Sequence, residues 1–142
     1  MPTERRFVFD TNVIVSALLL DQSVARRAFD KAMESGALLI SDATVEELNK
    51  VLRRKEFEKY VTEDERIEFI TALVRAADLV EITETVTECR DPKDNKFLEL
   101  AVSGKAACIV SGDRDLLQLH PFRGMLVLTP RQFLDHLWAD GR

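Results

Sequence analysis

The segment RFVFDTNV, residues 6–13, sets the start of the fold, because a short apolar run ends in a group of polar side chains. We predict a strand from Arg6 to Asp10, followed by a helix that begins near Val13. In an open parallel sheet, an acid at the end of the first strand lies at the carboxyl edge, where ligands usually bind. Asp10 can instead simply cap the following helix. This segment alone leaves both roles open.

Four more short apolar runs have the length of buried parallel strands. They lie at Ala37 to Ser41, Leu79 to Thr83, Ala106 to Ser111 and Gly124 to Leu128. Helical stripes of apolar residues separate them, and the capping-box spacing of Thr62 with Glu65 and of Thr129 with Gln132 marks two helix starts. Strands that alternate with helices predict an α/β fold with a mainly parallel sheet of about five strands, covered by helices on both faces.

The composition is that of an ordinary globular protein, with 142 residues, 46% of them hydrophobic and 32% charged. We expect residues 1–142 to form a single domain. The longest apolar run, Val13 to Leu20, is far shorter than the roughly 20 residues that span a bilayer. The only cysteines, Cys89 and Cys108, form no CxxC pair, which argues against a disulfide framework. These features lead us to expect a cytoplasmic protein with no membrane partner.

The net charge of -5 argues against a protein that binds nucleic acid simply by being basic. Any contact with nucleic acid must therefore be local. Two short basic clusters are candidates for phosphate contacts: Arg26 with Arg27, and Arg53 with Arg54 and Lys55. The alternative is that these charges form solvated helix faces.

A second candidate acid, Glu47, lies in the helix predicted after the second strand. At 100° per residue, Leu48 and Val51 belong to the apolar face of this helix, and Glu47 lies beside Val51 while Glu46 points nearly opposite. Glu47 also follows Thr44 at capping-box spacing, which is a structural role that needs no chemistry. Its position favours Glu47 as the acid that reaches a cleft.

Asp94 is the most informative acid in the sequence. Apolar residues follow it at three, four and seven positions, so it belongs to the buried stripe of its own helix. A carboxylate there is costly unless it is paired or bound to metal. A cap from Asp91, with Pro92 at the first helical position, explains an acid in the first turn but not its inward position. The pattern therefore favours a functional role.

The fourth acid follows the buried run that ends at Val110. The sequence Ser111-Gly112-Asp113-Arg114-Asp115 predicts a tight turn, which we expect Gly112 to permit. Asp115 precedes an apolar helical start with capping spacing, so we predict that Asp115 caps this helix and that Asp113 is the ligand.

All four acids fall at or just beyond the carboxyl ends of predicted strands, which indicates one shared site. Clustered carboxylates repel one another unless divalent cations neutralise them. Ligation by oxygen alone suits Mg²⁺ or Mn²⁺, hard cations that also bind phosphate oxygens. We therefore predict a magnesium or manganese site.

Several of these motifs resemble those of PIN domains. They are Phe-Asp-Thr-Asn-Val (9–13), Glu47-Leu48 with Val51-Leu52-Arg53, Asp91-Pro92-Lys93-Asp94-Asn95, and Ser111-Gly112-Asp113-Arg114-Asp115-Leu116-Leu117. The resemblance rests on the order and spacing of these motifs and extends from Arg6 to about Pro130. The subgroup that the chain most resembles is the toxin component of bacterial and archaeal toxin–antitoxin pairs, the VapC-like ribonucleases.

The resemblance implies a three-layer α/β/α sandwich and metal-dependent cleavage of RNA. It also implies an antitoxin protein as partner and a homodimer or higher oligomer. The implied catalytic and metal-binding residues are Asp10, Glu47, Asp94 and Asp113, and the supporting residues are Asn12, Ser111 and Asp115.

Two other functions fit part of the pattern. A phosphohydrolase resembling the haloacid dehalogenases would use Asp10, Ser41 and Asp113, but that family expects an Asp at the position of Asn12. A PIN-fold binding module without catalytic activity would use the same acids only to hold a structural metal or an inhibitory partner.

Overall fold

Five strands form one parallel sheet in the order β3-β2-β1-β4-β5. The computed structural model describes residues 4–138. The strands are β1 (Arg5–Phe9), β2 (Gly36–Ile40), β3 (Asp78–Leu79), β4 (Cys108–Val110) and β5 (Leu126–Leu128). The helices are α1 (Thr11–Leu19), α2 (Val24–Ser35), α3 (Asp42–Leu52), α4 (Glu63–Ala76), α5 (Asn95–Gly104), α6 (Arg114–Leu117) and α7 (Pro130–Asp135), with short 3-10 turns η1 (Lys55–Phe57) and η2 (Pro92–Asp94).

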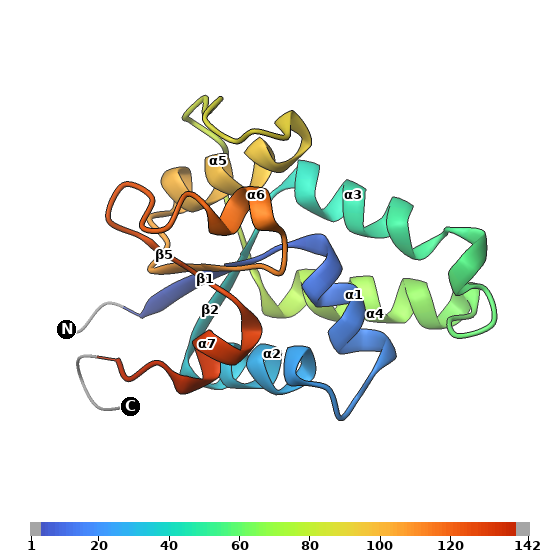
Figure 1. Cartoon of the computed structure of the whole chain (residues 1–142). Coiled ribbons are helices and arrows are strands. Elements are labelled where there is room, and N and C mark those ends of the chain that lie inside the picture. Colours follow the sequence, from blue (N-terminus) through green and yellow to red (C-terminus); the bar gives the residue numbers. More distant parts are fainter. Residues whose placement is uncertain (1–3, 139–142) are drawn as a thin grey trace.

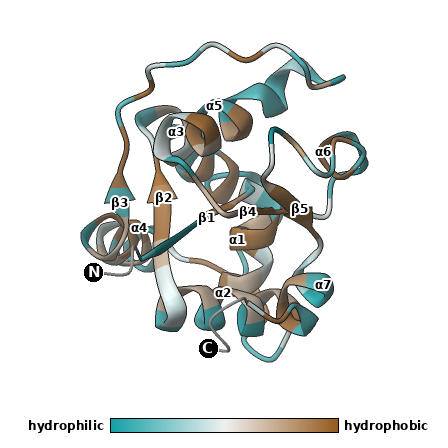
Figure 2. Cartoon of the chain, turned by 90° about the vertical axis from the view of Figure 1, so that its left-hand side faces the viewer, coloured by the Kyte–Doolittle hydropathy of each residue, from teal (hydrophilic) through white to brown (hydrophobic). Residues whose placement is uncertain are grey.

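Helices cover both faces of the sheet, because side chains that alternate along each strand enter two separate cores. In β1, Phe7 and Phe9 pack with α1, α2, α3, α4 and α7, whereas Val8 packs with α5 and α6. Leu38 and Leu39 of β2 divide in the same way. Figure 1 shows this three-layer arrangement, and β2 and β5 are coloured as hydrophobic along most of their length in Figure 2. The predicted α/β/α sandwich is confirmed.

Aromatic packing anchors the larger core. Phe7 and Phe133 are fully buried, and their rings meet edge to face with centroids 5.1 Å apart. Burying one such side chain contributes about 1.5–3 kcal/mol, so this pair holds α7 firmly to the centre of the sheet.

Two predicted helix starts are confirmed. Thr62 accepts a hydrogen bond from the backbone of Glu65, whose side chain accepts one in return, and Thr129 pairs with Gln132 in the same way. The predicted strand from Leu79 to Thr83 is wrong beyond Leu79, because β3 begins at Asp78 and ends at Leu79, and the backbone N–H of Thr83 bonds to a side chain of α5 instead of a strand.

No helix among residues 4–138 is long and apolar enough to cross a membrane. Cys89 and Cys108 are buried free thiols, and they belong to the two different cores.

Candidate metal centre

The first and fourth strands place two acids side by side at the carboxyl edge of the sheet. The chain runs outward from β1 to β2 and β3, then returns to β4 on the other side of β1. In open α/β sheets, ligands bind at such a reversal of strand order. Asp10 directly follows β1, and Asp113 lies three residues after the last residue of β4. In Figure 1, α3, α5 and α6 lie around the junction of β1 with α1.

A cavity of about 470 Å³ opens at this edge. All four acids of the predicted quartet line it, and each comes from a different part of the chain. The lining acids are Asp10, Glu47, Asp91, Asp94 and Asp113, and the lining basic residues are Lys50, Arg54 and Lys93.

Asp10 caps α1 and also lines the cavity. Its Oδ1 caps α1 by accepting a hydrogen bond from the backbone N–H of Val13 at 2.9 Å, and its Oδ2 accepts one from the hydroxyl of Ser111. Burial raises the pKa of Asp10 above its ordinary value, the hydrogen bonds from Ser111 and Val13 lower it in part, and the charge of Asp113 raises it again. Asp10 is only 4% exposed and is held at both oxygens, so its side chain is fixed in one orientation at the cavity.

Asp94 is held at an energetic cost. Burial raises its pKa from 3.8 to about 7, with further contributions from its side-chain hydrogen bond to Asp113 and from the charges of Asp113, Asp91 and Asp10. Its Oδ2 is buried and has no hydrogen-bond partner among the described residues. Buried polar atoms normally have a partner. An orphaned carboxylate oxygen among other acids fits a site for a cation.

Glu47 has no capping role. The capping box at the start of α3 is formed by Ser41 and Thr44, so the capping reading of Glu47 is wrong. Glu47 instead accepts hydrogen bonds from the hydroxyl of Thr11 and from the ammonium of Lys96. Contacts from α1 and α5 therefore hold both of its oxygens at the cavity.

The cap predicted at Asp115 needs correction. Asp113, and not Asp115, is the N-cap of α6, because α6 begins at Arg114 and Asp113 Oδ1 accepts a hydrogen bond from the backbone N–H of Asp115 at 2.8 Å. Gly112 has no left-handed backbone, so the turn does not require a glycine. Asp115 is free of the cap, and one carboxylate oxygen from each of Asp91, Asp94 and Asp115 lies within 4.8 Å of the others.

Asp91 lines the cavity but was not predicted as a site residue, because the sequence already assigned it a role as a helix cap. The structure confirms that cap: Asp91 accepts a hydrogen bond from the backbone N–H of Lys93 at the start of η2. An extended segment leads to it and runs over α5 in Figure 2. Side chains of α5 at four-residue spacing bind the backbone of this segment: Ser103 at Thr83, Glu99 at Val86 and Asn95 at Cys89. The three-residue spacing of Asp91 and Asp94 in "DPKDN" was the available signal that a second acid lies beside Asp94.

The other predicted residues differ in burial and in whether they line the cavity. Ser111 is fully buried and bonded to Asp10, while Asn12 lines the cavity with an exposed side chain. Of the predicted basic residues Arg53, Arg54 and Lys55, only Arg54 lines the cavity. Arg53 lines a separate hollow.

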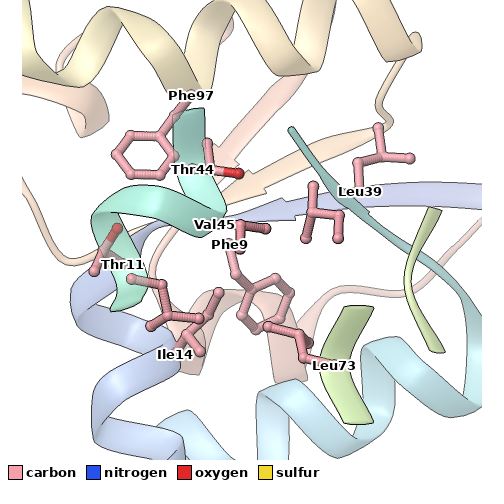
Figure 3. A pocket seen from close by; sticks show the side chains of 10 residues that line it. Phe9, Thr11, Ile14, Leu39, Thr44, Val45, Leu73 and Phe97 are labelled. Atoms are coloured by element: carbon pink, nitrogen blue, oxygen red, sulfur yellow. The ribbon is translucent and has the colours of Figure 1, made fainter. Parts of the chain in front are cut away.

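A small apolar cavity in the core lies against the acidic one. It has a volume of about 10 Å³, and Thr11 and Phe97 line both cavities. Figure 3 shows Phe9, Ile14 and Leu73 gathered around this space. A space of this size holds at most about one water molecule, so it belongs to the core and is not a binding site.

Comparisons with known proteins agree with this geometry. The family described as "PIN domain" matches residues 6–115. The uncharacterized protein MJ1680 of Methanocaldococcus jannaschii is 28% identical over 140 residues, which cover 92% of this chain and 90% of that protein.

Two solved structures have the same fold. VapBC2 from Rickettsia felis, bound to a DNA fragment from its promoter, matches with a TM-score of 0.60 and 12% identity over 86% of this chain and 96% of that one. VapBC-1 from nontypeable Haemophilus influenzae matches with a TM-score of 0.60 and 14% identity over 89% and 98%. Since the family match covers most of the chain and the site lies within it, the chain belongs to the PIN domain family.

Proposed function

We propose that this protein is a metal-dependent endoribonuclease that cleaves RNA internally, and that it is the toxin of a toxin–antitoxin pair. One observation carries the proposal: five carboxylates from four separate parts of the chain line a single cavity that also carries three basic side chains. The acids suit a divalent cation, and the basic residues suit the phosphates of a nucleic acid.

The donors suit Mg²⁺ or Mn²⁺, because all of them are carboxylate oxygens and one, on Asp94, is buried without a partner. We assign the metal to Asp10, Glu47, Asp94 and Asp113, with Asp91 and Asp115 beside Asp94 as further ligands. When bound, the ion supplies a Lewis acid that lowers the pKa of water and neutralises charge on the phosphate.

The remaining steps belong to the side chains of the cavity. Ser111 orients Asp10, and Thr11 with Lys96 orients Glu47. Lys50, Arg54 and Lys93 hold the phosphates that flank the scissile bond. Asp94, whose pKa is about 7 without metal, releases its proton when it binds the ion.

Single-stranded or looped RNA is the proposed substrate. The chain has a net charge of -5, and the described residues that line the cavity include only three basic ones, which is too few for tight binding to any duplex. Unpaired RNA is flexible enough to bring one phosphate to an acidic site, and its exposed bases allow sequence choice.

The proposed partners follow from family resemblance. The two similar structures are of VapBC complexes, which supports an antitoxin partner for this chain. The exposed apolar side chains Ile67 and Val74 on α4 offer surface for self-association as a homodimer or larger oligomer. We place this activity in the cytoplasm, where RNA and an antitoxin are available.

The alternatives are less well supported. In the phosphohydrolase reading Ser41 would contact substrate, but Ser41 is 2% exposed and its hydroxyl is bonded to Thr44 as the cap of α3. A binding module without activity has the same acids, so it is distinguished only by assay.

The test is a digest of single-stranded RNA, structured RNA, single-stranded DNA and duplex DNA by the purified protein, in Mn²⁺, Mg²⁺ or EDTA. We expect internal cuts in unpaired RNA that need the metal. Preferential cutting of either DNA contradicts the ribonuclease, and no cutting at all supports the binding module.

A further inference from the structure

A second hollow adjoins the acidic cavity on the side of α2 and α7. Its volume is about 310 Å³, and it is lined by Asn12, Val13, Ser16, Ala25, Gly112, Asp113 and Pro130. This volume lies at the lower end of the roughly 300–1,000 Å³ that small-molecule sites occupy. The hollow has enough room for one compact organic group.

The two hollows share a wall. Asn12 and Asp113 line both of them, so a chain bound at the acids can continue past these side chains into the second hollow. The groups in the two hollows would then be neighbours along one substrate molecule.

The linings of the two hollows differ in charge. The acidic cavity carries Lys50, Arg54 and Lys93, whereas the described residues that line the second hollow include no lysine or arginine. The described lining of the second hollow therefore gives a phosphate no positively charged side chain to pair with. The second hollow therefore suits a neutral group.

The surfaces of the second hollow suit a flat, partly polar ring. Val13 and Ala25 are buried and give it an apolar floor, and Ser16 and Asn12 bring a hydroxyl and an amide that can donate or accept hydrogen bonds. A nucleobase has apolar faces and a polar edge. Binding pockets commonly combine an apolar lining with a few polar groups that set orientation.

We propose that the second hollow binds the base of the nucleotide next to the scissile phosphate. The inference rests on the proposed ribonuclease function and adds a position at which the protein selects its substrate. Lys50, Arg54 and Lys93 hold phosphates on one side of the acids, and the second hollow holds a base on the other.

Gly112 is a suitable position at which to add a side chain to the wall of the second hollow. A Cβ added at Gly112 meets no atom within 4 Å, and the backbone there is not left-handed, so a side chain can be added without strain. Gly112→Leu places a side chain at the wall of the second hollow. Ser16→Leu does so from α1, and Ala72→Leu at an exposed position on α4 is the matched control.

The test uses a cleavable RNA and a set of copies that each lack one base near the cleaved bond. With the unaltered protein, removing one particular flanking base should lower kcat/KM about tenfold, the scale of one lost contact in an apolar pocket. Gly112→Leu and Ser16→Leu should lower kcat/KM on the intact RNA and abolish the difference between intact and abasic copies, with Mn²⁺ binding unchanged. Ala72→Leu should behave as the unaltered protein does.

The outcomes are distinct. If the unaltered protein cleaves RNA but all abasic copies equally well, or if Gly112→Leu and Ser16→Leu retain the preference for a base, the second hollow is not a base site. If one of these two variants fails to fold, as judged by its melting curve, the cleavage test is made with the other variant alone. If the unaltered protein cleaves no RNA, the proposed function fails and this inference fails with it.

Discussion

Lys96, on α5, forms an ion pair with Glu47, on α3, at the edge of the acidic cavity. The two side chains are 24% and 26% exposed, so the pair is only partly screened by water. Four other carboxylates line the same cavity as Glu47. The ion pair therefore holds Glu47, a proposed metal ligand, in place and offsets part of the acid repulsion.

Replacing Lys96 should destabilise the protein most when metal is absent. We expect Lys96→Met to lower the free energy of unfolding in EDTA by about 1 kcal/mol, because Glu47 loses its partner among like charges. Mn²⁺ should restore more stability to this variant than to the unaltered protein. Urea unfolding with and without Mn²⁺ measures both effects, with Lys55→Met as an exposed control; equal losses in the two variants would count against the role of Lys96.

Stability in EDTA should fall as pH rises from about 4 towards about 7. The folded protein retains the proton of Asp94, whose pKa is raised from 3.8 to about 7, while the unfolded chain releases it near 3.8. A raised carboxyl pKa thus contributes stability at low pH that is lost as pH increases. Asp94→Asn should flatten this profile and be the more stable protein at pH 8, and a slope unchanged by the substitution would show that another group is responsible.

The basic residues of the cavity should control RNA affinity. Lys50→Ala with Arg54→Ala removes two phosphate contacts, so RNA binding should weaken and the slope of log K against log salt should become shallower by about 1.4. Arg53→Ala with Lys55→Ala is the matched control, because Arg53 lines a separate hollow. Fluorescence anisotropy across salt concentrations compares the two pairs, and a larger effect from the control pair would place the RNA elsewhere.

Asp91 should contribute to metal binding. Mn²⁺ at about 100 times its dissociation constant stabilises a protein that binds it only when folded by roughly 2.7 kcal/mol, which should appear as a higher Tm. Asp91→Asn retains a residue that can cap η2 but removes a charge beside Asp94, so it should reduce the Mn²⁺-induced shift. Asp64→Asn, at an exposed position on α4, should not; equal shifts in all three proteins would exclude Asp91 as a ligand.

The fold could be predicted from the sequence because its signals are local. Alternating apolar residues in β1 divide between two cores, and the caps at Thr62 and Thr129 need only their own neighbours. The end of β3 could not be predicted in this way, because its continuation depends on Ser103 of α5.

The site was predictable as a set of acids but not as a set of contacts. Helical periodicity correctly predicted that Glu47 reaches the cavity. The shift of the cap from Asp115 to Asp113 depends on where α6 begins, and sequence patterns do not resolve a helix start to within one or two residues. Lys96 and Thr11 reach Glu47 from other elements, so no spacing along the chain reveals them.

The most direct test of the central claim is the rate at which single-stranded RNA is cleaved as Mn²⁺ is titrated, for the unaltered protein, Asp94→Asn and Asp64→Asn. If the acids form one metal centre, the unaltered protein and Asp64→Asn will show the same saturable dependence on Mn²⁺. Asp94→Asn will remain folded and lose at least about 100-fold in rate at every concentration, as expected when a metal site is disrupted. Equal cleavage by folded Asp94→Asn, or cleavage that persists in EDTA, would contradict the account.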